Sequence, residues 1–167
     1  MLFRSATYEK LFEAAANAAV ETGAPVMVHI EQEADALHVV DFFAGKGLAP
    51  QRLILCHLDR ARYDFAYHRD CAQTGAFLEY DTIHRLKYHD DAKEAEIIEY
   101  MLSAGFSKQL LLGLDTTNAR LRSYGAKDMG LDFILRSFIP FMESRGISEE
   151  QMHEMLVDNP QQALKIS

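Results

Sequence analysis

The sequence lacks the features that mark secreted, membrane-spanning and disulfide-rich proteins. Only 2 cysteines, Cys56 and Cys71, occur among 167 residues, too few for a disulfide framework or for a paired Cys-x-x-Cys zinc site. No apolar run approaches the roughly 20 residues of a membrane-spanning helix, and the N-terminus has no apolar signal core. We therefore predict a soluble, cytoplasmic protein with no membrane partner.

Clustered positive charge is also missing. The formal net charge is −8, and no group of Lys and Arg residues stands out along the chain. This argues against nucleic acid or an anionic membrane surface as a partner, and favours metals or small molecules. With 49% apolar residues and no linker or low-complexity segment, residues 1–167 are predicted to form a single domain.

Four short apolar runs each end in a polar residue that can bind a metal or move a proton. Their length and aliphatic content are typical of buried strands of a parallel sheet. The runs are Val26–His29, Leu53–His57, Phe77–Asp81 and Leu110–Asp115. Parallel strands require crossover connections, so we expect helices between them.

Amphipathic stretches supply those helices. They cover Thr7 to about Thr22, Glu33–Gly45, Arg62–Gln73, Asp91–Ser103 and Leu131–Arg145, with a last helix opening at Ser148. The first is predicted to bury Leu11, Ala15, Ala18 and Ala19. Pro140 is expected to bend or break its helix, and Ser148 with Gln151 forms a predicted capping box. The acidic residues of 90–96 are predicted to form a helix N-terminal turn and a solvated face.

The run ends are separated by 28, 24 and 34 positions, the length of one strand–helix unit. Four such units predict an α/β fold corresponding to half of a (β/α)₈ barrel, in which residues at the carboxyl ends of the strands converge on one mouth. An open doubly wound sheet, serving as a signalling or nucleotide-binding domain, is the competing layout. No GxGxxG or Walker-type loop follows any run, which disfavours it.

Two histidines and one aspartate are the candidate metal ligands. His29 and His57 emerge from their runs at the same relative depth, and Asp115 follows the apolar run of a third. Imidazole nitrogen and carboxylate oxygen together suit Zn²⁺ and similar ions. Asp115 beside a metal is also a candidate proton acceptor, whereas its alternative role is to cap the Thr-Thr-Asn turn that follows.

The sequence resembles the C-terminal half of phosphotriesterase-related proteins of the amidohydrolase superfamily. The resemblance rests on VHIE, ILCHLDR and LLLGLD in this order, followed by FIPF, GIS and NP near the C-terminus. It covers nearly the whole chain, beginning at about Ala6, so the first five residues are expected not to be native to the domain. A TIM barrel with strands five to eight in this chain is implied.

The resemblance implies a hydrolase with two divalent ions, usually zinc, in each complete barrel. Hydroxide bridging them attacks a phosphotriester, lactone or related ester. His29 and His57 would ligate one ion, while Asp115 would ligate the other and act as general base. The family's HxH pair and bridging lysine have no counterpart here, so the chain is expected to be a fragment whose activity alone is uncertain.

Further residues are predicted near the mouth. Asp81, Thr82 and Arg60 match positions where the family places substrate-facing residues, although Asp81 has an equal alternative as a turn cap. Nearby loops contain Arg85, Lys87, Tyr88, His89, Tyr124 and Lys127, which are interpreted as solvated, with a role in substrate specificity as the alternative. The alternative function is a non-catalytic half-barrel module that binds a partner or self-associates through its exposed sheet, and a homo-oligomer is expected in either case.

Overall fold

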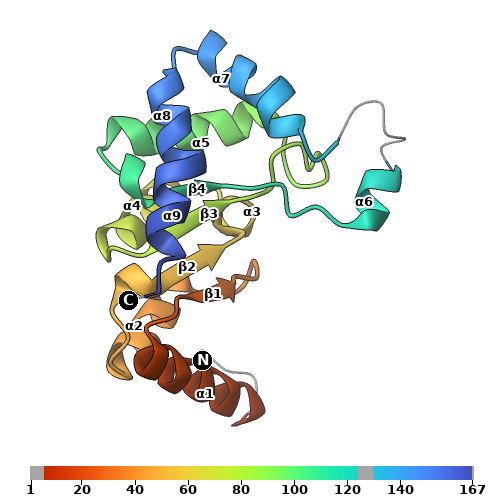
Figure 1. Cartoon of the computed structure of the whole chain (residues 1–167). Helices are drawn as coiled ribbons and strands as arrows, with labels where there is room; N and C mark the ends of the chain where they lie inside the picture. Colours follow the sequence, from red (N-terminus) through yellow and green to blue (C-terminus); the bar gives the residue numbers. More distant parts are fainter. Residues whose placement is uncertain (1–5, 124–129, 167) are drawn as a thin grey trace.

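A computed structural model describes residues 6–123 and 130–166. Its centre is a parallel sheet of four strands in the order β1 (Val26–His29), β2 (Leu53–Cys56), β3 (Phe77–Tyr80) and β4 (Leu110–Leu112) (Figure 1). Each strand pairs with the next along the chain, with Leu55 opposite both Val28 and Leu78. The predicted α/β half-barrel layout is confirmed. Tyr124 and Lys127 lie outside the described residues.

Helices connect the strands and follow β4. They are α1 (Ala6–Thr22), α2 (Ala36–Gly45), α3 (Leu58–Ala61), α4 (Phe65–Gln73), α5 (Asp91–Ser103), α6 (Asn118–Ser123), α7 (Ile139–Ser144), α8 (Glu149–His153) and α9 (Asn159–Ala163). Aspartates cap three of the crossover helices, because the side chains of Asp35, Asp64 and Asp90 accept hydrogen bonds from backbone amides in the first turn. The crossovers are therefore stabilised locally as well as by packing.

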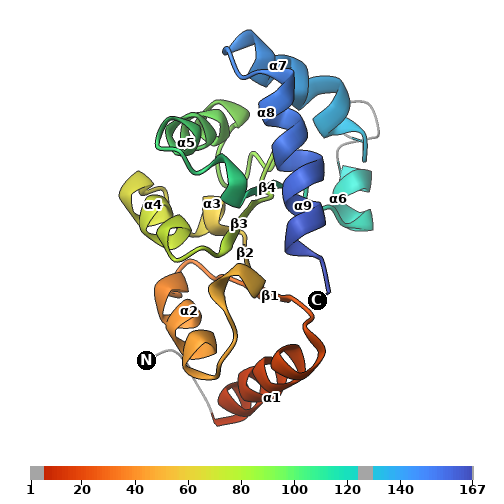
Figure 2. The same cartoon turned by 60° about the vertical axis from the view of Figure 1, so that its left-hand side comes forward.

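The two faces of the sheet are covered differently. Leu53, Leu55, Leu78 and Leu110 are fully buried in the large core formed with the helices. On the opposite face, Ile54, Cys56 and Leu111 form a small cluster with Ala163 of α9. Figures 1 and 2 show α8 and α9 crossing near β4, while α1 lies at the β1 end. On β1 Met27 stays 54% exposed.

Two details of the predicted helices differ from the structure, and a third agrees with it. On α1 the buried residues are Ala16 and Ala19, while Leu11 is 60% exposed, so its predicted inward face was wrong in part. The short helix α3 was not predicted, because four residues are too few to show a helical period. Pro140 does perturb its helix: the π-helical turn 134–138 comes just before it, where a proline interrupts regular hydrogen bonding.

The predicted capping box at the start of α8 is present. Ser148 Oγ accepts from the amide of Gln151 at 3.2 Å, and Gln151 Oε1 accepts from the Ser148 amide at 2.9 Å. We expect Ser148→Ala to lower the free energy of unfolding by about 1 kcal/mol. Urea denaturation measures this, and Ser144→Ala, which removes an exposed hydroxyl inside α7, serves as control. Equal midpoints for the two variants would contradict the assignment.

Within the described residues, no helix has the length and apolar content needed to cross a bilayer.

Candidate functional site at the strand ends

Predicted site residues from all four strand–helix units meet at the carboxyl edge of the sheet. The rings of His29 and His57 lie edge to face, with centroids 4.3 Å apart. His57 Nδ1 lies 2.7 Å from Asp81 Oδ2 and 4.0 Å from Asp115 Oδ2. The two imidazoles and two carboxyl groups therefore surround a common region beyond the strands.

The backbone is strained where two of these residues leave their strands. His57 has φ 63° and Asp115 φ 39°, both in the left-handed region. Such conformations cluster at functional sites, and His, Asp and Asn tolerate them better than other residues with side chains. Gly113 permits the ends of β3 and β4 to approach closely, because a Cβ there would lie 3.1 Å from Asp81 Cβ.

Burial and crowding of acids control the charge of the Asp81–His57 pair. Burial, together with the nearby carboxyl groups of Asp59, Glu79 and Asp115, raises the pKa of Asp81 to about 9. Burial also lowers the pKa of His57, with Arg60 and His29 acting in the same direction. Without a bound cation, both groups are therefore held near neutrality at pH 7, despite being close enough for an ion pair.

The raised pKa of Asp81 predicts a pH dependence of stability. An acid whose pKa is raised on folding binds more protons in the folded chain, so stability falls as pH rises from about 4 towards about 9. Asp81→Asn should reduce the loss of stability between pH 5 and pH 8 in chelator-treated protein, as measured by urea midpoints. Asp41→Asn on exposed α2 surface is the control. A drop unchanged in Asp81→Asn would contradict this account.

Two arginines, Arg60 of α3 and Arg85 of the loop after β3, contact the candidate ligands. Arg60 Nη2 lies 3.0 Å from His29 Nε2, and Arg85 donates to Asp115 Oδ2. Arg60 Nη1 also donates to the hydroxyl of Tyr88 at 3.1 Å. Positively charged arginine side chains therefore lie beside the acidic cluster at the mouth. The Asp115 side chain is partly exposed and pairs with a charged group, so it is not buried in apolar packing.

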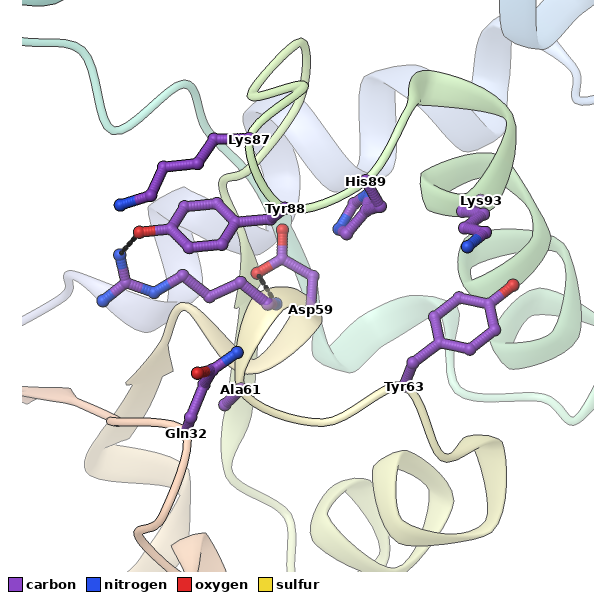
Figure 3. Close-up of a pocket in the computed structure, with 9 residues that line it drawn as sticks. Gln32, Asp59, Ala61, Tyr63, Lys87, Tyr88, His89 and Lys93 are labelled. Atoms are coloured by element: carbon purple, nitrogen blue, oxygen red, sulfur yellow. Dashed lines mark hydrogen bonds between the residues drawn. The ribbon is translucent and has the colours of Figure 1, made fainter.

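A cavity of about 350 Å³ opens beside this mouth (Figure 3). Its lining residues are Gln32, Asp59, Arg60, Ala61, Tyr63, Lys87, Tyr88, His89 and Lys93. Of the predicted substrate-facing residues, Arg60 lines it. Asp81 and Thr82 are 3% and 1% exposed and contact other side chains, so a direct substrate contact by either remains a prediction. Lys87, Tyr88 and His89 belong to the lining, although they were interpreted as solvated loop residues.

A second polar cluster, made by Asp59, Thr82, His89 and Glu94, was missed from the sequence. Glu94 was assigned to a solvated face, yet it is fully buried, which is a correction. A signal was available: Glu94 stands three, four and seven residues before Ile97, Ile98 and Met101, on the apolar stripe of α5. Burial raises the pKa of Glu94 well above its usual range, and the Asp59 carboxyl adds to the shift.

The donors at the strand ends suit divalent ions. Two imidazoles and a carboxylate are present, and a carboxyl group next to His57 Nδ1 is the arrangement that orients a histidine toward a metal through Nε2. His29 Nε2 lies 2.9 Å from Glu31 Oε1 and 3.0 Å from Arg60 Nη2, and Arg85 donates to Asp115 Oδ2. His29, His57 and Asp115 therefore fit the metal ligands predicted from sequence, with Asp81 as a positioning partner.

Comparison with known proteins identifies the chain. The profile of the phosphotriesterase family matches residues 5–164. The chain belongs to the phosphotriesterase family. It is 31% identical to a phospho-furanose lactonase of Mycoplasmopsis synoviae, over 93% of this chain and 45% of the relative, and 29% identical to an N-acetyltaurine hydrolase of Danio rerio, over 93% and 48%.

Solved structures of the family superpose on the chain. A lactonase from Listeria monocytogenes is 28% identical and gives a TM-score of 0.90, covering 100% of this chain and 52% of that one. The phosphotriesterase homology protein of Escherichia coli, with phosphate in its active site, is 26% identical and gives 0.89, covering 96% and 55%. The chain spans about half the length of the curated relatives it matches.

Proposed function

We propose that this phosphotriesterase-family chain supplies the C-terminal half of a metal-dependent barrel that hydrolyses an ester, lactone or phosphotriester. The observation that carries the proposal is the convergence of His29, His57 and Asp115 at one edge of the sheet. Lactonases and an amide hydrolase among its relatives support hydrolysis as the reaction. Because the chain spans only about half of these relatives, the activity belongs to the proposal for the whole barrel.

Each residue has a role in this proposal. His29 and His57 would hold one divalent ion, and Asp115 would hold a second, with Zn²⁺ favoured by the mixed imidazole and carboxylate donors. When bound, the ions would supply Lewis acidity and ease deprotonation of water. Asp115 would act as the proton acceptor for that water, and Asp81 holds the His57 ring in place through Nδ1. Arg85 orients Asp115 by donating to Oδ2.

Three positively charged side chains near the cavity favour a substrate with an anionic substituent. Arg60, Arg85 and Lys87 surround the ring of Tyr88, with the charged group of each 5.1–5.4 Å from its centroid. Like charges gathered at one aromatic side chain attract an anion in a partly enclosed site. The phospho-furanose lactonase relative carries a phosphate in its named substrate, which supports a phosphorylated lactone as the first substrate to assay.

Activity is tested on the chain alone and on the chain co-expressed with the N-terminal half of the Mycoplasmopsis synoviae lactonase, here called the complemented barrel. Lactone hydrolysis by the complemented barrel should disappear after chelation and return with Zn²⁺. The matched control is the N-terminal half alone, treated in the same way. Full activity in chelator, or zinc-restored activity in the control, would count against the proposal.

Self-association is a second candidate, favoured by exposed apolar side chains. Tyr8, Leu11 and Val20 on α1 and Met27 on β1 are each more than half exposed. Such side chains are typical of surfaces that another chain covers. Light scattering should give a mass above that of one chain, and Leu11→Lys should lower it, whereas Lys10→Ala should not. A monomer at micromolar concentration would remove this candidate.

A further inference from the structure

The cluster of Asp59, His89 and Glu94 lies beside the strand-end site but draws on other side chains. Asp59 belongs to α3, Glu94 to the first turn of α5, and His89 to the loop before α5. One ligand atom from each lies within 4.8 Å of the other two. Asp59 is 1% exposed, and the side chains of Glu94 and His89 are 0% and 7% exposed.

Two carboxyl groups are buried here, and one of them lacks a hydrogen-bond donor at one oxygen among the described residues. Asp59 Oδ1 accepts from the Arg60 amide at 3.0 Å, and Asp59 Oδ2 accepts from the Thr82 amide at 2.7 Å. Glu94 Oε1, by contrast, is buried with no hydrogen-bond partner in the described structure. A buried carboxylate oxygen with no donor is costly unless a cation or a proton accompanies it.

The hydroxyl of Thr82 makes the shortage explicit. Its oxygen contacts Asp59 Oδ2 and lies 3.4 Å from Glu94 Oε2 and 3.0 Å from His89 Nε2. One hydroxyl carries a single proton, so it can satisfy only one of these three acceptors at a time. When it donates to Asp59 Oδ2, the other two acceptors, Glu94 Oε2 and His89 Nε2, receive no hydrogen bond from this hydroxyl and lie 3.3 Å apart.

The ring of His89 is held in a form suited to metal binding. Its Nδ1 lies 3.1 Å from the Asp90 carbonyl oxygen, which can only accept, so Nδ1 carries a hydrogen. In a neutral ring Nε2 then has its lone pair free, and this atom lies 3.3 Å from Glu94 Oε2. A histidine that donates from one nitrogen to a backbone carbonyl is a common arrangement of metal ligands.

A route from solvent reaches the cluster. Asp59 and His89 line the cavity described above, and Figure 3 shows both side chains between Tyr88 and Lys93. The geometry points to a divalent-cation site made by Asp59, His89 and Glu94, with Thr82 Oγ1 beside it, additional to the strand-end site. One imidazole and two carboxylates suit Zn²⁺ among the first-row ions. Such an ion would join the ends of β2 and β3 to α5 and stabilise the pocket wall.

The test uses the chain in a His57→Asn background, which removes one of the proposed strand-end ligands, and it measures metal binding, so it does not depend on the proposed hydrolase activity. After chelator treatment, Zn²⁺ alone is added by equilibrium dialysis, and bound metal and melting temperature are measured. We expect about one Zn²⁺ per chain and a higher melting temperature. Glu94→Gln, nearly identical in shape, should lose that equivalent or bind it at least about tenfold more weakly.

Glu96→Gln is the matched control, because Glu96 lies on the same helix but accepts from Tyr63 at the exposed surface. It should retain both the ion and the rise in melting temperature. In chelator, Glu94→Gln should melt no lower than its parent, since glutamine keeps the shape of the side chain and replaces a buried acid whose Oε1 has no donor, and this separates lost binding from misfolding. Equal Zn²⁺ content and equal stabilisation in parent and Glu94→Gln would overturn the site. So would a parent that binds none, in which case a shared proton holds the carboxyl groups together.

Discussion

His57→Asn is expected to lower kcat/KM for lactone hydrolysis by the complemented barrel by at least about 100-fold. Loss of a metal ligand should cost at least as much as loss of the groups that support ligands, which reaches about 100-fold. Asparagine is the informative replacement because His57 has φ 63°, and Asn tolerates this backbone where alanine adds strain. Steady-state kinetics and bound-metal analysis measure the effect.

The control is another histidine with a left-handed backbone. His84 has φ 56° and stacks on Phe133, with ring centroids 4.3 Å apart, and it is not among the proposed ligands. His84→Asn should therefore retain kcat/KM within about threefold, since surface and packing changes of this kind act mainly on stability. If both variants lost activity equally, backbone strain rather than ligation would explain the result for His57.

The strand–helix order could be predicted because its signals are local. Parallel strands buried on both faces appear as short apolar runs, and Asp91–Ser103 shows both a cap and a continuous apolar stripe. The helix α3 gave no such signal, because it has four residues and follows a backbone reversal at His57. Leu11 also follows the helical period, yet period alone does not determine which helix face is covered.

The candidate site was predictable only where each residue stood at a strand end. His29, His57, Asp81 and Asp115 all did, and the fixed geometry of a parallel sheet brings such positions together. Their mutual contacts were not predictable, because the Asp81–His57 pair depends on side-chain direction and burial. Glu94 shows the same limit: its helical position indicated burial, but its neighbour Asp59 is 35 positions earlier in the sequence.

Both polar clusters follow from the same physical feature of the fold. Each of the strands β2 and β3 is followed by a pair of polar residues at the same edge of the sheet. His57 and Asp59 follow β2, and Asp81 and Thr82 follow β3. Within each unit the first residue faces the strand-end site, where His57 meets Asp81. The second faces α5, where Asp59 meets Thr82. Because the two residues of each pair are at most two positions apart, a substitution in one cluster is expected to affect the other through the backbone. Metal binding therefore has to be measured separately for each cluster.

Asp115→Asn is expected to lower kcat of the complemented barrel by about 10² to 10⁴-fold, the usual contribution of a general base. The substitution keeps the size of the side chain, and Asn tolerates φ 39° at this position, so the backbone should persist. The amide oxygen can still accept from Arg85.

Metal content separates the two roles proposed for Asp115. If the variant keeps its ions and loses kcat, proton transfer is the main role, whereas loss of one ion together with kcat indicates ligation. Asp132→Asn is the control, since the Asp132 carboxylate contacts Arg136 at the exposed surface, at 3.1 Å, and such pairs contribute little. An Asp115→Asn enzyme within tenfold of the parent would exclude both roles. Among the described carboxyl groups, only Asp81 and Asp115 lie within 4.0 Å of His57 Nδ1. Asp81 could not replace Asp115 as the base, because it is buried and its raised pKa makes it a poor base at pH 7.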